Sequence, residues 1–199
     1  MRNRRSPEDE WKRLKPDAEH ALQMLLSEIP DHANPQSLFE AYAYAKNIAA
    51  RAMQSRMLGD LPAENREFKL LHAKINQEMY SRYKNAVPAS FLRTPYSGKT
   101  HEYLFSLLQK NLAQPVQAAM LRIVTADNVH TERRARELRE LGLDVHWYDI
   151  EEISVYELRS LDIDFGMIPA IIRNNVRKSK SMPKDQKQLI LRNAGIPEI

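Results

Sequence analysis

The chain has 199 residues, enough for one or two small domains with a hydrophobic core. It contains no cysteine, which excludes disulfides, thiolate metal sites and a cysteine nucleophile, and its net charge of +4 allows a nucleic-acid partner without demanding one. No apolar run reaches the length of about 18 residues that a membrane span needs, and no apolar stretch follows the basic N-terminus as in a secretory signal. We therefore expect a cytoplasmic protein that does not enter a membrane.

Residues 1–95 are predicted to form a region made only of helices. Three amphipathic segments follow one another, at residues 8–29, 35–58 and 62–86. The last two begin with a proline, which suits the first turn of a helix, whereas Pro16 is predicted to interrupt the first segment. This helical region is expected to provide a dimer or partner interface, such as that of a homodimer.

Residues 96–160 are predicted to form a winged helix-turn-helix. An amphipathic helix (THEYLFSLLQKNL) is followed by a short helix that begins at Pro115, by a polar turn, and by a third helix at 131–141. Two alternating runs, LDVHWYDI and ISVYEL, then predict a small wing of two strands near residues 143–158. This order of helices and strands is the plan of a winged helix-turn-helix.

The helix at 131–141 is the predicted recognition helix. Its apolar residues Ala135, Leu138 and Leu141 fall on one face, which leaves its arginines on or near the other faces. The DNA-binding residues predicted in and before this helix are His130, Thr131, Arg133, Arg134 and Arg136.

Two kinds of contact are expected from this set. Arg133 and Arg136 lie in the first half of the helix and are expected to reach base edges in the major groove. His130 and Thr131 are expected to lie near a phosphate at the helix N-terminus.

The same helix suits two other interpretations. Its alternating charges are typical of a solvated helix face, and Glu137 and Glu140 are expected to repel backbone phosphates. A winged helix that contacts only proteins is the main competitor of the DNA-binding interpretation.

Residues 161–199 are predicted to form basic C-terminal helices. Between residues 173 and 192 the sequence has seven basic residues and one acidic residue, a local charge of +6. Such a concentration of positive charge favours contacts with phosphates that carry no sequence information. The DNA-binding residues predicted here are Arg173, Arg177, Lys178 and Lys180.

A resemblance to a known family appears in the sequence LRIVTADNVHTERRARELRELGLDV. This stretch resembles the winged-helix module that precedes the catalytic domain in many HNH-type endonucleases of restriction systems, and more loosely the winged helices of other restriction enzymes. The similarity covers about 60 residues, and PKDQKQLILRNAG is similar to the helix that leads into the first Cys-x-x-Cys of those nucleases. The chain has no cysteine and no His-Asn-His arrangement, so the family's catalytic and zinc residues have no matching positions. The resemblance therefore implies DNA binding and a restriction context only.

A different nuclease pattern is present in the helical region. Asp60, Glu67 and Lys69 resemble the two acids and the lysine that hold Mg²⁺ and assist the attacking water in another class of nuclease. That pattern normally lies on adjacent strands, whereas Glu67 and Lys69 fall within a predicted helix. Surface charges on a helix are the better interpretation of these three residues.

The sequence thus predicts a mainly α-helical protein that binds double-stranded DNA and reads the major groove with the helix at 131–141. The first alternative is a type II restriction-like endonuclease with an unrecognised Mg²⁺-dependent active site. The second is a helical protein for protein–protein interaction or regulation. No metal site and no cofactor is expected, except Mg²⁺ if the protein is a nuclease.

Overall fold

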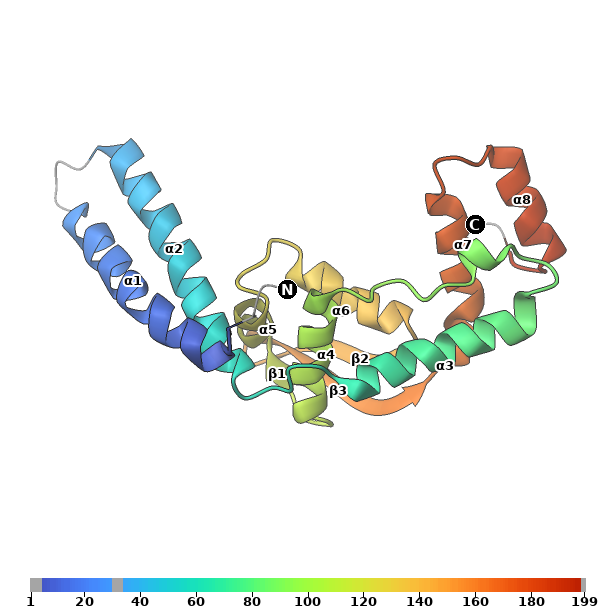
Figure 1. Cartoon of the computed structure of the whole chain (residues 1–199), viewed down its shortest axis with the longest axis horizontal. Helices are drawn as coiled ribbons and strands as arrows, with labels where there is room; N and C mark the ends of the chain where they lie inside the picture. The colour runs from blue at the N-terminus through green and yellow to red at the C-terminus, as the bar shows by residue number, and fades with distance from the viewer. Residues whose placement is uncertain (1–4, 30–33, 198–199) are drawn as a thin grey trace. The chain divides into compact units, whose positions relative to one another are not determined.

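The computed structural model describes residues 5–29 and 34–197 (Figure 1). These residues form mostly helices and one small sheet, so the predicted mainly α-helical class is confirmed. The chain forms two compact units, which interleave along the sequence: the first contains residues up to Ala63 together with Gln117–Thr131, and the second contains Glu64–Val116 together with the residues from Glu132 onwards. The three consecutive domains expected at 1–95, 96–160 and 161–199 remain a prediction.

The first unit is built around a hairpin of two long helices, α1 (Pro7–Ser27) and α2 (Pro35–Leu58). Each helix starts with a capping side chain that accepts a hydrogen bond from a backbone N–H of the first turn: the Ser6 hydroxyl does so for α1 and the Asn34 amide oxygen for α2. The short helix α5 (Ala118–Val124) packs against α2, where the Gln54 amide donates a hydrogen bond to the carbonyl oxygen of Val124 at 2.9 Å.

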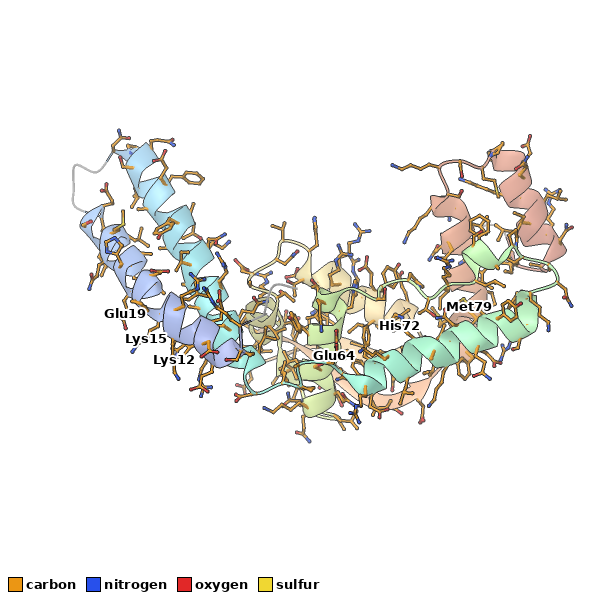
Figure 2. The ribbon with its side chains drawn as sticks, viewed as in Figure 1. Lys12, Lys15, Glu19, Glu64, His72 and Met79 are labelled. Carbon is orange, nitrogen blue, oxygen red and sulfur yellow. The ribbon has the colours of Figure 1, made fainter. Side chains whose placement is uncertain are left out.

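The predicted interruption at Pro16 is wrong, because α1 runs through this residue without a break. Proline inside a helix costs about 3 kcal/mol through the lost hydrogen bond and the steric clash. Packing of Leu14 and Ala21 against α2 offsets this cost, and Pro16 itself is exposed. Figure 2 shows Lys12, Lys15 and Glu19 along the side of α1 that faces away from α2.

The second unit contains the remaining long helices. These are α3 (Arg66–Tyr83), α4 (Lys99–Lys110), α6 (Thr131–Glu140, of which the residues from Glu132 belong to this unit), α7 (Ile168–Lys178) and α8 (Lys184–Asn193). Two single turns of 3₁₀ helix, η1 (Ala89–Phe91) and η2 (Phe165–Met167), lie between them. Helix α3 begins four residues later than predicted, because the Asn65 side chain caps it by accepting a hydrogen bond from the N–H of Phe68.

The core of the second unit consists of large side chains. Helix α3 buries one stripe, which includes Ile75 and Met79, and contacts both α4 and α7. Figure 2 shows His72 and Met79 on the same side of α3. The largest fully buried side chains of this unit are Phe105, Ile75, Met79, Leu104, Leu108, Leu138, Leu141, Leu158, Ile168 and Ile172.

In the described part of the chain, the sheet has three strands rather than the two that were predicted. Strand β2 (Leu143–Ile150) pairs with β3 (Ile153–Ile163) in antiparallel register, with Val145 opposite Leu158, and the short strand β1 (Val116–Gln117) pairs with the other edge of β3. The order is therefore β1-β3-β2. Two residues are too few to show an alternating pattern, which is why the sequence did not predict β1.

Gly142 joins the end of α6 to the sheet. Its φ of 89° lies in the left-handed region, and a Cβ atom at this position would stand 2.5 Å from the carbonyl oxygen of Asp164. The Gly142 carbonyl oxygen accepts a hydrogen bond from the N–H of Asp164 at 2.9 Å. Only glycine fits this close approach, which fixes where α6 ends. None of the described helices is long and apolar enough to span a membrane.

Candidate nucleic-acid interface

Helix α6 buries the predicted apolar stripe and presents arginines to solvent. Ala135, Leu138 and the following Leu141 are completely buried, whereas Arg133 and Arg136 are exposed. The spacing of three residues puts the two arginines on the same side of the helix. The helix is thus held by its apolar face while this arginine pair remains accessible.

Glu137 does not lie on the exposed face, which corrects the expectation that it would repel phosphates. Its side chain is only 4% exposed, and its carboxylate accepts hydrogen bonds from Arg133 Nε at 3.1 Å and from Arg134 Nη1 at 2.8 Å. Burial alone raises the pKa of Glu137, but the hydrogen bonds from Arg134 and His101 outweigh it and hold the pKa below its usual range. Glu137 therefore acts as an internal counterion of α6.

His101 is the third partner of Glu137 and comes from α4. Its Nε2 lies 2.7 Å from Glu137 Oε2, and its Nδ1 is buried without a hydrogen-bond partner among the described residues. Burial lowers the pKa of His101, and the hydrogen bond to Glu137 only partly opposes this effect. These contacts are those of a neutral imidazole that donates its Nε2 proton to the Glu137 carboxylate. Residues 36 apart in sequence meet here, so no local pattern predicted this contact.

A pocket of about 300 Å³ opens beside the exposed face of α6. The residues that line it are Tyr96, Arg133, Arg136, Glu137, Glu140, Asn174 and Lys178. It therefore brings together two segments that were predicted separately to bind DNA, the recognition helix and the basic C-terminal segment. Both segments belong to the second unit.

Tyr96 lies between the two segments. Its hydroxyl donates a hydrogen bond to the Glu140 carboxylate, while Lys178 Nζ lies 3.4 Å from the same hydroxyl oxygen and 5.1 Å from the ring centroid. Burial, and after it the hydrogen bond to Glu140, raises the pKa of Tyr96 well above its usual range. Tyr96 thus remains neutral and keeps its hydroxyl proton for the hydrogen bond to Glu140, one of the two acidic residues that line the pocket. No local sequence pattern predicts this role, because Tyr96 is distant from both segments along the chain.

The other predicted DNA-binding residues of the C-terminal segment differ in accessibility. Arg177 and Lys180 are exposed, as is Lys178. Arg173 is half-buried: its Nη1 donates to the carbonyl oxygen of Pro197 at 3.3 Å, and its Nε is buried without a hydrogen-bond partner among the described residues. Arg173 therefore holds the Pro197 backbone against α7 and offers less of its charge to a ligand than the three exposed residues do.

His130 and Thr131 belong to the first unit. His130 is exposed, and its backbone N–H donates a hydrogen bond to the Asn128 side chain at 3.1 Å. Thr131 is 1% exposed, and its hydroxyl donates to the Asn128 carbonyl oxygen and lies 2.7 Å from the Thr125 hydroxyl. With these partners the Thr131 side chain stabilises the turn before α6 and is not accessible to a phosphate.

The structure describes all three nuclease candidates, Asp60, Glu67 and Lys69. Asp60 lies in the first unit, whereas Glu67 and Lys69 are exposed in the first turn of α3, where Lys69 pairs with Glu64. No group of three or more His, Asp or Glu side chains in the described part of the chain is arranged to hold a metal ion.

Comparisons of the chain with family models, with curated proteins and with solved structures found no match. The function proposed below therefore rests on the sequence and on the positions of these residues in the structure.

Proposed function

We propose that this protein binds duplex DNA through a basic surface of the second unit, which we define as Arg133 and Arg136 of α6 together with Arg177, Lys178 and Lys180 at the end of α7. The observation that carries the proposal is the shared pocket, because Arg133, Arg136 and Lys178 all line it. Two independent predictions from distant parts of the sequence thus converge on one surface.

The exposed arginines suit the major groove. Arg133 binds Glu137 through Nε, which leaves both of its terminal nitrogens without a hydrogen-bond partner among the described residues. Arg136 makes no hydrogen bond and no ion pair within the described part of the chain. An arginine with two free terminal nitrogens can donate both to the O6 and N7 atoms of guanine, the commonest base-specific contact.

The end of α7 suits the sugar-phosphate backbone. Arg177 and Lys178 occupy the last turn of α7, and Lys180 lies two residues after the end of this helix. Lysines and arginines in such a cluster neutralise phosphates and release bound cations, which adds affinity for every sequence. The two acidic residues nearby repel phosphates only weakly. Glu137 is buried between two arginines, and the Glu140 carboxylate accepts a hydrogen bond from the Tyr96 hydroxyl.

The order of elements supports a winged helix as the DNA-binding fold. Helix α4, strand β1, helices α5 and α6, and strands β2 and β3 follow one another along the chain. In helix-turn-helix proteins of this plan, the second helix of the motif enters the major groove with its N-terminal residues near the bases. Helix α6 is the corresponding helix here. A role in a restriction system rests on the sequence resemblance alone.

The test is binding of the full chain to a duplex of random sequence, measured by fluorescence anisotropy over a series of salt concentrations. The double variant Arg136→Ala/Lys178→Ala should bind more weakly and should lower the slope of log affinity against log salt by about two, since each lost phosphate or base-edge cation contact lowers it by about one. The matched control is Lys74→Ala/Lys84→Ala, which removes two exposed charges from α3 and the residue after it and should leave the affinity within about twofold.

Two results would contradict the proposal. One is a wild type without measurable affinity for duplex DNA at low salt. The other is an equal loss of affinity in both double variants, which would reflect total charge rather than this surface. Adding Mg²⁺ to the same complexes tests the nuclease alternative, because only a nuclease converts the labelled duplex to shorter products.

A further inference from the structure

The hairpin of the first unit exposes large apolar side chains along one part of its length. We call residues 18–29 and 34–45 the distal half of the hairpin. Seven of its large apolar side chains are exposed, among them Leu22 (47%), Leu26 (67%), Phe39 (62%) and Tyr42 (52%). Soluble monomers rarely leave a contiguous group of this kind uncovered.

These four side chains lie on the same side of the hairpin. Ala21 and Leu25 of α1, and Leu38, Ala41 and Ala45 of α2, are buried or half-buried, which places them on the sides of the two helices that face each other. Leu22, Leu26, Phe39 and Tyr42 each follow one of these inward residues by one position. In two antiparallel helices, the residues one position after the inward stripe turn to the same side, because a two-fold axis perpendicular to the pair relates the helices. Leu22, Leu26, Phe39 and Tyr42 therefore form one apolar face.

The two halves of the hairpin carry charges of opposite sign. The distal half carries Glu19, Glu28 and Glu40 and no lysine or arginine, a charge of −3. The proximal half, residues 5–17 and 46–58, carries seven basic and four acidic residues, a charge of +3. Two hairpins that run in opposite directions thus bring the acidic end of each toward the basic part of the other.

We propose that the distal halves of two copies of this chain pack against each other and form a homodimer with two-fold symmetry. The apolar faces meet at the centre, and the two hairpins run in opposite directions, so that four helices surround the buried Leu22, Leu26, Phe39 and Tyr42. A second copy is the occupant because a single surface supplies both the apolar face and the complementary charges. This proposal uses only the first unit and does not depend on DNA binding.

The test is the mass of the full chain in solution, measured by size-exclusion chromatography with light scattering and by sedimentation over a range of concentrations. The wild type should have the mass of two chains of 23.2 kDa. Leu26→Glu/Phe39→Glu should raise the dissociation constant of the dimer about thirtyfold or more, because both positions would be central anchors of the interface. Both residues are exposed in the single chain, and unchanged circular dichroism of the variant would show that its helices are intact.

A matched control and a charge test complete the experiment. Leu189→Glu makes the same change at a leucine of α8 that is 59% exposed and should leave the mass unchanged. Glu19→Lys/Glu28→Lys/Glu40→Lys should weaken the dimer, and high salt should weaken the wild-type dimer as well. A monomeric wild type at tens of micromolar would overturn the proposal, as would a dimer that Leu26→Glu/Phe39→Glu leaves intact.

Discussion

The two units bury their helices in different ways. In the first unit, the contact between α1 and α2 consists largely of small side chains: Ala21, Ala41, Ala45 and Ala52 are buried, and Leu14 is the main large one. In the second unit, leucine, isoleucine, methionine and phenylalanine fill the core, and even a carboxylate, Glu137, is buried with its partners.

This difference shows what each unit achieves by itself. Alanine lets two helices approach closely but removes little apolar area from water, and the stabilisation is roughly 25 cal/mol for each Å² removed. The hairpin therefore keeps much of its apolar area on the outside, whereas the second unit encloses its own. The two tryptophans provide separate probes of the units, since Trp11 lies in α1 and Trp147 in β2.

Removal of volume should damage the second unit most. Leu138→Ala deletes a side chain that is completely buried and should lower the free energy of unfolding by about 2–5 kcal/mol, the sum of lost burial and the cavity left behind. Urea unfolding followed by Trp147 fluorescence in a Trp11→Phe background measures this effect. Leu189→Ala, at a 59% exposed leucine of the same unit, should change the free energy by less than about 0.5 kcal/mol. Similar losses in both variants would mean that the core is not packed as described.

Addition of volume should damage the first unit. Ala45→Leu places three extra carbon atoms in the contact between α1 and α2 and should cost about 1–3 kcal/mol through overpacking. Ala43→Leu makes the same change at an exposed position two residues earlier and should change the free energy by less than about 0.5 kcal/mol. The probe is Trp11 fluorescence in a Trp147→Phe background. If Ala45→Leu were harmless, the helices would be less closely packed than the buried alanines indicate.

The stability of the second unit should depend on pH through a buried histidine, which is a smaller effect than the two above. Burial, and after it repulsion from His101 when that residue is protonated, lowers the pKa of His72 from 6.5 to about 4. Because the pKa of His72 is lower in the folded chain, the unfolded chain binds the proton at a higher pH. The contribution of neutral His72 to the free energy of unfolding is therefore intact above pH 6.5 and is lost as the pH falls toward about 4. After allowance for partial solvent screening, the free energy of unfolding of the second unit should fall by about 1 kcal/mol between neutral pH and about pH 5.

Variants at two histidines test this contrast. His72→Gln should reduce the pH dependence of the second unit, measured by urea unfolding at the two pH values. His20→Gln, at an exposed histidine of α1, should leave the pH dependence of the first unit unchanged. An equal response of both units would assign the effect to acids present throughout the chain rather than to a buried histidine.

The sequence predicted those features that depend on neighbours along the chain. The helices from 7 to 58, the apolar face of α6 and the strands β2 and β3 follow from periodicity, from proline at a first helical turn, and from an alternating pattern. It did not predict features that depend on distant residues. Pro16 was predicted to break α1 because packing on α2 is invisible in a local pattern, and Glu137 was placed on the surface because its partner His101 is 36 residues away. The pocket beside α6 depends in the same way on distant residues: Lys178 was predicted to bind DNA separately from α6, and Tyr96 was not predicted.

The internal counterion of α6 has a consequence for the entropy of binding. A free arginine side chain loses up to about 2 kcal/mol of rotamer freedom when a ligand holds it in one conformation. Arg133 and Arg134 are already held by Glu137, so part of their freedom is lost when the chain folds and not when a ligand arrives. Arg136, which has no such partner, keeps its freedom until binding. Helix α6 thus combines arginines whose direction is set in advance with one that adapts to the ligand it meets.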